Sequence, residues 1–235
     1  FAALLLLIVL VAFRILDPTP TQTWRNQAFD VYQRIKPRVY VPQPVGIIDI
    51  DEASIREHGQ WPWPRSKLAE LVTRATQMGA VAIGFDIVFA EKDRLSPALI
   101  AEDNDALSEE LKAALLALPS NDTLFANAIK NSRIVVGQTS VRRLQDAAEE
   151  AQPIRDVPHA FLGENPTPFL RKYPSLVQNL PELEDAAMGH GMFTIEPDAD
   201  GVFRRIPLVM MVKDKIRLFL SVELLRIATG GGAFA

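Results

Sequence analysis

The hydrophobic pattern of the chain begins with an unbroken apolar run, FAALLLLIVLVAF, from Phe1 to Phe13, which Arg14 ends. A bilayer-spanning helix needs about 20 apolar residues. Because the sequence does not start with Met, we expect preceding residues to complete the run. A signal peptide would lead into a cleavage site of small residues, whereas FRILDPTP follows here. The pattern therefore predicts the C-terminal part of a transmembrane helix over residues 1–16.

A second helix is predicted from Thr21 to Lys36, after a break at Asp17-Pro18. Its apolar residues recur at helical spacing and form one stripe: Trp24, Ala28, Val31, Tyr32 and Ile35. Prolines follow as far as Pro44 and indicate an extended connector. Residues 17–44 are thus interpreted as a juxtamembrane helix and connector.

Apolar strands then alternate with amphipathic helices. The predicted strands are Val45–Ile50, Val81–Phe89 and Arg133–Thr139. The predicted helices cover residues 65–78, 105–117 and 122–130, the first bounded by Pro64 and Gly79. This order is typical of a layered α/β fold with a parallel βαβαβ core. We assign the domain to residues 45–229.

The last part of the domain has a different pattern. Residues 142–187 are rich in proline and show no clear period. Asp200-Gly201 lies between two apolar runs, 191–195 and 206–212, which predicts a C-terminal antiparallel hairpin. A final amphipathic helix is expected over 218–228. Residues 230–235 are interpreted as the start of a link to further membrane segments.

Composition narrows the classes of function. The net charge is −4 and the isoelectric point near 5.5, and no basic face is apparent, so nucleic acid is not an expected partner. The chain has no cysteine, which excludes disulfides, thiolate nucleophiles and zinc sites with cysteine ligands.

Carboxylates lie at the ends of two of the predicted strands: Asp49 and Asp51 at the end of the first, and Asp86 near the end of the second. Carboxyl ends of neighbouring parallel strands meet at one sheet edge, where ligands bind. The three acids therefore predict a ligand site or a site for a calcium or magnesium ion. Two alternatives stay open: Asp51 is an N-cap for a following helix, and the others pair internally with arginine or lysine. A further alternative is a metal-dependent phosphoesterase built on this cluster.

WPWPR, residues 61–65, precedes the first helix of the domain. Its prolines favour extended backbone, which places two indole rings near the same sheet edge. Trp61 and Trp63 could pack as a loop on the core, or form an aromatic wall of a ligand pocket with Arg65 as its cationic contact.

Five blocks in this order resemble the second class of CHASE domains, the cyclase/histidine-kinase-associated sensory extracellular domains. The blocks are IIDIDEASI, GQWPWPR, MGAVAIGFDIVFAEKDR, IVVGQT and GHGMFTIEPDADGVFRRIPL. The similarity extends over residues 29–228.

The resemblance implies a sensory input domain on the outer, periplasmic face of a bacterial inner membrane, without catalytic activity of its own. Members of the family regulate a cytoplasmic effector, commonly a class III adenylate cyclase, and otherwise a histidine kinase, a diguanylate cyclase or a Ser/Thr kinase. The stimulus would be a small molecule, an ion or a protein. A homodimer is expected, with Trp24, Ala28, Val31 and Ile35 on the signal-transmitting helix; a purely structural dimerisation module is the remaining alternative.

Overall fold

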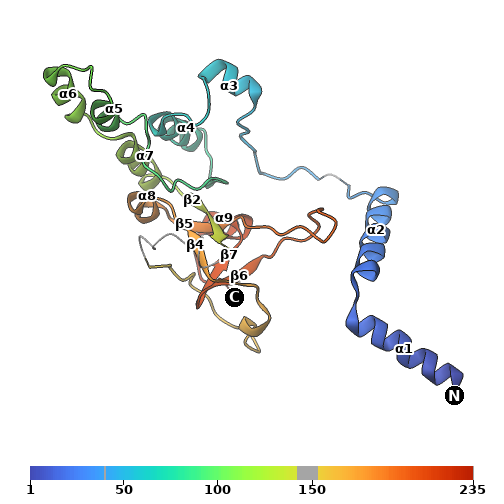
Figure 1. Cartoon of the computed structure of the whole chain (residues 1–235). Coiled ribbons are helices and arrows are strands. Elements are labelled where there is room, and N and C mark those ends of the chain that lie inside the picture. The colour runs from blue at the N-terminus through green and yellow to red at the C-terminus, as the bar shows by residue number, and fades with distance from the viewer. Residues whose placement is uncertain (40, 142–152, 235) are drawn as a thin grey trace. The chain divides into compact units, whose positions relative to one another are not determined.

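A computed structural model describes residues 1–39, 41–141 and 153–234 (Figure 1). The chain divides into two compact units. The first comprises Phe1–Asp49 together with Glu196–Arg205, and the second comprises Ile50–Ile195 together with Ile206–Ala235. The chain therefore leaves the second unit after Ile195, passes through residues 196–205 of the first unit, and returns to the second unit at Ile206.

The first unit contains two helices, α1 (Ala2–Leu16) and α2 (Thr19–Ile35), which are separated by Asp17 and Pro18. Asp17 adopts a left-handed conformation with φ 38°. Among the described residues, no single helix is both long and apolar enough to cross a membrane. Together, α1 and α2 meet that length and hydropathy, but only as a pair bent by 78° at the break. The transmembrane helix over residues 1–16 stays a prediction.

The second unit contains the remaining elements (Figure 1). Its helices are α3 (Glu52–His58), α4 (Arg65–Gln77), α5 (Pro97–Asp103), α6 (Glu109–Leu116), α7 (Asn121–Lys130), the 3-10 turn η2 (Thr167–Phe169), α8 (Pro181–Ala186) and α9 (Leu220–Ala228). Its strands are β1 (Ile83–Gly84), β2 (Ile134–Val141), β3 (Lys172–Tyr173), β4 (Ser175–Val177), β5 (Gly189–Met192), β6 (Val209–Val212) and β7 (Lys215–Leu218).

Two sheets are formed by these strands. In the larger, β1 and β5 pair with β2 in parallel, and β4 pairs antiparallel with the end of β2. In the smaller, β3 is parallel to β6, and β6 is antiparallel to β7. The expected mixed α/β architecture and the parallel relation of the two later predicted strands are therefore confirmed.

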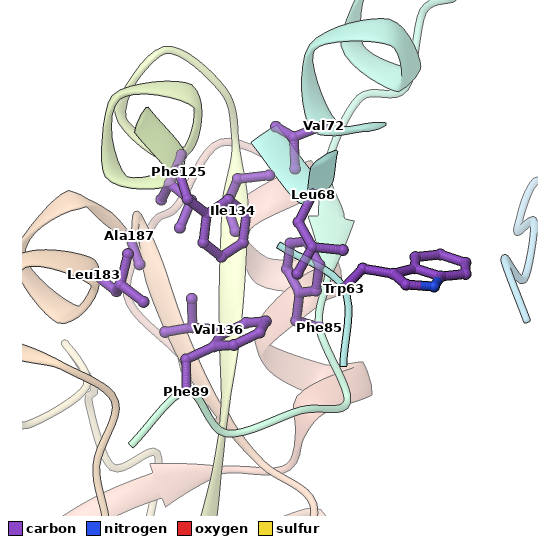
Figure 2. Close-up of a cluster of buried hydrophobic side chains, with 11 residues drawn as sticks. Trp63, Leu68, Val72, Phe85, Phe89, Phe125, Ile134, Val136, Leu183 and Ala187 are labelled. Carbon is purple, nitrogen blue, oxygen red and sulfur yellow. The ribbon is translucent and has the colours of Figure 1, made fainter. Parts of the chain in front are cut away.

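The main core lies where α4, α7 and α8 meet β2. Phe85, Phe89 and Phe125 form three mutual edge-to-face contacts with centroids 5.2–5.6 Å apart. Ile134 and Val136 of β2 complete the cluster, and Trp63 lies at its edge (Figure 2). Alternate residues of a strand point to opposite faces, so the residues of β2 that alternate with Ile134 and Val136 face another element on the opposite side of the sheet.

Helix α9 covers that other face. It packs against β1, β2 and β5, and it approaches β5 so closely that only glycine fits. A Cβ on Gly191 would lie 2.6 Å from Cα of Leu220, and one on Gly189 would lie 2.5 Å from Oε1 of Glu223. The GHG sequence of β5 is thus explained by helix–strand packing.

The first predicted strand is wrong. Residues 45–50 form no strand in the structure, and Val45, Ile47 and Ile48 are exposed. An apolar, β-branched sequence favours a strand only where a neighbouring strand pairs with it, and among the described residues none does. The second predicted strand is also much shorter than expected, because only Ile83–Gly84 pairs with β2.

The hairpin predicted around Asp200-Gly201 is wrong as well. Asp-Gly does form a tight turn, in which the Gly201 N–H donates to the Asp198 carbonyl at 2.9 Å. The Asp198 N–H also donates to the Val202 carbonyl at 3.0 Å, but the apolar runs 191–195 and 206–212 do not pair with each other, because β5 pairs with β2 and β6 pairs with β7. The antiparallel hairpin of this region is instead formed by β6 and β7, and its turn contains Lys213, which has a φ of 55°.

Candidate functional site

The three predicted carboxylates of the strand-end site have separate environments. Asp49 lies in the first unit and is exposed, and Asp86 in the second unit is also exposed. Asp51 caps α3, because its Oδ1 accepts the Ser54 N–H at 2.8 Å and the Ser54 hydroxyl at 2.7 Å. These hydrogen bonds lower the pKa of Asp51. The helix-cap interpretation of Asp51 is therefore confirmed.

The two tryptophans do come together. Trp61 and Trp63 make an edge-to-face contact at 5.7 Å, and the Trp63 indole N–H donates to the Gly59 carbonyl at 2.7 Å. Trp63 is buried and Trp61 is half-buried. Both pack on the main core, so the structure places them as the loop-packing alternative describes.

Arg65 is buried in an internal polar network. Its guanidinium forms an ion pair with Asp122 of α7 and donates to the Glu91 carbonyl, and it lies over the Phe89 ring at 5.2 Å. The Arg65 backbone N–H donates to Asp93 Oδ2 at 2.7 Å. Arg65 therefore fastens the start of α4 to the loop after Phe89 and to α7.

No cation site emerges from these residues. Within residues 1–39, 41–141 and 153–234, no three His, Asp or Glu side chains gather closely enough to hold a metal ion. Calcium or magnesium binding by Asp49, Asp51 and Asp86 stays an untested prediction.

A different charged cluster organises the first unit. Arg204, whose side chain is 5% exposed, binds three carboxylates. It donates to Asp30 of α2 at 2.9 and 2.7 Å, to Asp198 at 3.0 Å, and to Asp200 at 2.8 and 2.7 Å. These hydrogen bonds lower the pKa of Asp30 and bring that of Asp200 to about 2. We call Arg204 with Asp30, Asp198 and Asp200 the Arg204 cluster.

The Arg204 cluster gives α2 two distinct faces. Asp30 lies one turn after Asn26, which is buried, so both occupy one side of the helix. On the opposite side, Trp24, Val31 and Ile35 are exposed. One face of α2 therefore contacts the segment 196–205, and the apolar stripe faces away from it.

A third polar cluster is centred on Glu184 of α8. Its carboxylate accepts hydrogen bonds from His190 Nε2 at 2.9 Å, Gln138 Nε2 at 2.9 Å and the Asn179 backbone N–H at 2.8 Å. Burial raises the pKa of Glu184, but these donors outweigh it and bring the pKa to about 2. The cluster ties α8 to β2 and β5.

Beside this cluster lies a cavity of roughly 350 Å³ between β5, β7, α9 and residues 155–158. Arg217 of β7 is on its wall and is 2% exposed. Its guanidinium donates to the Gln138 side chain at 2.5 Å and to the Arg155 and His190 carbonyls at 2.5 and 3.1 Å. Burial lowers the pKa of Arg217, and the negative charges of Glu184 and Glu223 oppose this effect.

Arg217, Glu184 and Glu223 are not among the predicted site residues. Two of these residues do have a sequence signal, because each is a single charge within an apolar stretch. Arg217 interrupts KIRLFL, and Glu223 interrupts SVELL. A charge in a buried strand or helix face needs compensating partners. Spacing alone does not say which residues those partners are.

Comparison with known proteins identifies the family. No curated protein and no solved structure matches the chain significantly. The family model of the CHASE2 domain matches residues 2–233, essentially the whole chain. The chain therefore belongs to the CHASE2 family, non-catalytic extracellular sensory domains found in membrane-bound signalling receptors.

Proposed function

We propose that this chain is the periplasmic input domain of a receptor in a bacterial inner membrane, and that it regulates a cytoplasmic effector. A class III adenylate cyclase is the favoured effector; a histidine kinase, a diguanylate cyclase or a Ser/Thr kinase would be regulated in the same way. Beyond family membership, the observation that carries the proposal is the Arg204 cluster. It binds α2 to the segment 196–205, whose two ends continue into the second unit.

The Arg204 cluster is suited to transmit a signal. Arg204 is nearly buried, and its guanidinium holds Asp30 with two hydrogen bonds, a geometry that fixes orientation as well as distance. A change in the position of the segment 196–205 would therefore be passed to α2 rather than absorbed by a flexible contact. Since α2 follows the apolar helix α1 by two residues, it is placed to pass such a change towards the membrane.

The exposed stripe of α2 supports a second part of the proposal, a homodimer. Trp24, Val31, Tyr32 and Ile35 leave an apolar helix face without a partner within the described chain. A second copy presenting the same stripe would bury it in a two-fold helix pair. Paired input domains would then bring two effector domains together.

We expect single cysteines on this stripe to cross-link between two copies of the receptor in membranes. Ala28→Cys, Val31→Cys and Ile35→Cys should give high dimer yields under mild oxidation, because two-fold pairing brings equivalent positions close together. Gln33→Cys is the matched control, since residue 33 is exposed but lies on the opposite face of α2. Yields are read on non-reducing gels.

Equal yields at all four positions, or none at any, would contradict the proposed helix pair. A purely structural dimerisation module would cross-link on the same face, but its oxidation would leave effector output unchanged. A phosphoesterase would instead hydrolyse a generic phosphoester in a Mg²⁺-dependent manner with the purified chain, and loss of that activity in Asp49→Asn would assign it to the strand-end carboxylate.

A further inference from the structure

We propose that the cavity bordered by Arg217 binds a small monoanionic organic carboxylate. This inference rests on the proposed sensory function, for which it names the chemical class of ligand. The cavity volume, roughly 350 Å³, lies at the lower end of the range of small-molecule sites. The cavity belongs wholly to the second unit.

The charges on the wall leave one cation without a carboxylate partner. Arg226 binds Glu223 at 2.7 Å, and Arg155 forms an ion pair with Asp185. Among the described residues, Arg217 has only neutral acceptors, and its Nε–H is buried with no acceptor at all. The carboxylates of Glu184 and Glu223 act on this guanidinium only through space, and a buried charge that no carboxylate bonds directly is incompletely compensated. An anion in the cavity would add a direct partner.

The other charges limit the ligand to a single negative charge. Two carboxylates, Asp156 and Glu223, also line the cavity. Both are occupied: Asp156 Oδ1 accepts the N–H groups of Val157 and Ile216 at 3.0 and 3.1 Å, and Glu223 is held by Arg226. Their two negative charges would repel a dianion more strongly than a monoanion.

The rest of the wall favours an organic molecule over an inorganic anion. Val157, Ala187, Met188 and Ile227 contribute apolar surface around the charged groups. A short hydrocarbon body would bury against them, with its carboxylate on the Arg217 side. Guanidinium and carboxylate are well matched in shape and charge.

The position of the cavity links ligand binding to the Arg204 cluster. Gly189 and His190 on its wall belong to β5, and Arg217 belongs to β7, which pairs with β6. The segment 196–205 begins four residues after Met192, the end of β5, and ends four residues before Val209, the start of β6. A ligand that shifts these strands would act on both ends of the segment that holds α2.

The test uses the chain 1–235 in detergent micelles, with butyrate as the probe at constant ionic strength. A ligand that binds only the folded state raises the thermal midpoint. We expect a rise of about 5 °C at a hundredfold excess over the dissociation constant. Butyramide, the neutral analogue of the same shape, and inorganic phosphate, an anion without an apolar body, should give little or no rise.

Two variants keep the result interpretable. Arg217→Met removes the cation and should abolish the response, but it could also perturb folding. Met188→Glu places a carboxylate at a position that is half exposed on the cavity wall, so it should fold normally and weaken butyrate binding at least about tenfold. Met78→Glu is its control, because Met78 is exposed and outside the cavity.

Absence of a butyrate response in the unaltered chain would overturn the proposal, and so would a response that survives Met188→Glu. An equal response to phosphate would overturn the assignment to a carboxylate. None of these results tests the coupling of α2 to effector output, which is measured separately. Butyrate binding without that coupling would overturn the proposed sensory function, while the carboxylate site itself would stand.

Discussion

Replacing Arg65 with Met is expected to lower the free energy of unfolding by about 3–5 kcal/mol, the range for removing one partner of a buried ion pair. Arg65 is buried, and its partner Asp122 is 2% exposed. Without the guanidinium, the Asp122 carboxylate keeps the hydrogen bond from the Asp93 N–H at 3.1 Å. The side-chain volume is nearly retained, so the loss comes from the uncompensated carboxylate rather than from a cavity.

Arg74→Met is the matched control for this variant. Arg74 lies on the same helix, α4, and pairs with Glu70 on the exposed face. Arginine and methionine have similar helix propensities, and exposed pairs contribute about 0–1 kcal/mol. Urea unfolding followed by circular dichroism compares the two variants. A loss at Arg65→Met no larger than that at Arg74→Met would contradict the structural role assigned to this network.

Replacing Glu184 with Gln is expected to lower the free energy of unfolding at pH 7 by about 3 kcal/mol, since each unit of pKa shift corresponds to about 1.4 kcal/mol. The carboxylate has a pKa of about 2 in the folded chain against an ordinary value of 4.5. The amide cannot offer the same two acceptor oxygens to His190, Gln138 and Asn179. The three elements that meet at this carboxylate would lose their common contact.

The effect of Glu184→Gln should depend on pH. Because the folded-state pKa of Glu184 is depressed, its contribution is complete above the unfolded value of 4.5 and is lost as pH falls towards 2. The difference between wild type and variant should fall to less than about half by pH 3. Unfolding curves at pH 7, 5, 4 and 3 measure it.

Glu182→Gln provides the control, because Glu182 is an exposed residue of the same helix, α8. It should change stability by less than about 0.5 kcal/mol at every pH. A Glu184→Gln difference that stays constant from pH 7 to pH 3 would mean that ionisation of this carboxylate does not stabilise the fold.

The helices of this protein could be predicted from sequence better than its strands. Local signals such as Pro64 before α4 and the stripe of α2 depend on residues a few positions apart, and both helices form close to where expected. Strand pairing depends on distant partners. The apolar residues 45–50 and the flanks of Asp200-Gly201 have strand-like composition, but their pairing is absent or goes elsewhere.

The site was predicted less well than the fold for a related reason. Spacing identified Asp51, Trp63 and Arg65 as unusual, and all three make specific contacts, but those contacts are internal. The charged groups that the structure brings together come from distant parts of the chain: Arg204 binds Asp30 across 174 positions, and Arg217 binds Gln138 across 79. No local pattern encodes such pairs, although the family resemblance was correct.

The most direct test of the central claim is effector output in membranes that contain the full-length protein carrying this chain. For the favoured effector, the measured product is cyclic AMP formed from ATP. Arg204→Gln breaks the hydrogen bonds to Asp30, while Arg205→Gln, at a 65% exposed side chain with one bond to Asp198, serves as control. We predict that Arg204→Gln changes basal cyclic AMP formation about fivefold or more and that Arg205→Gln leaves it unchanged. Output unaffected by Arg204→Gln, in a receptor that still folds and reaches the membrane, would contradict signalling through α2.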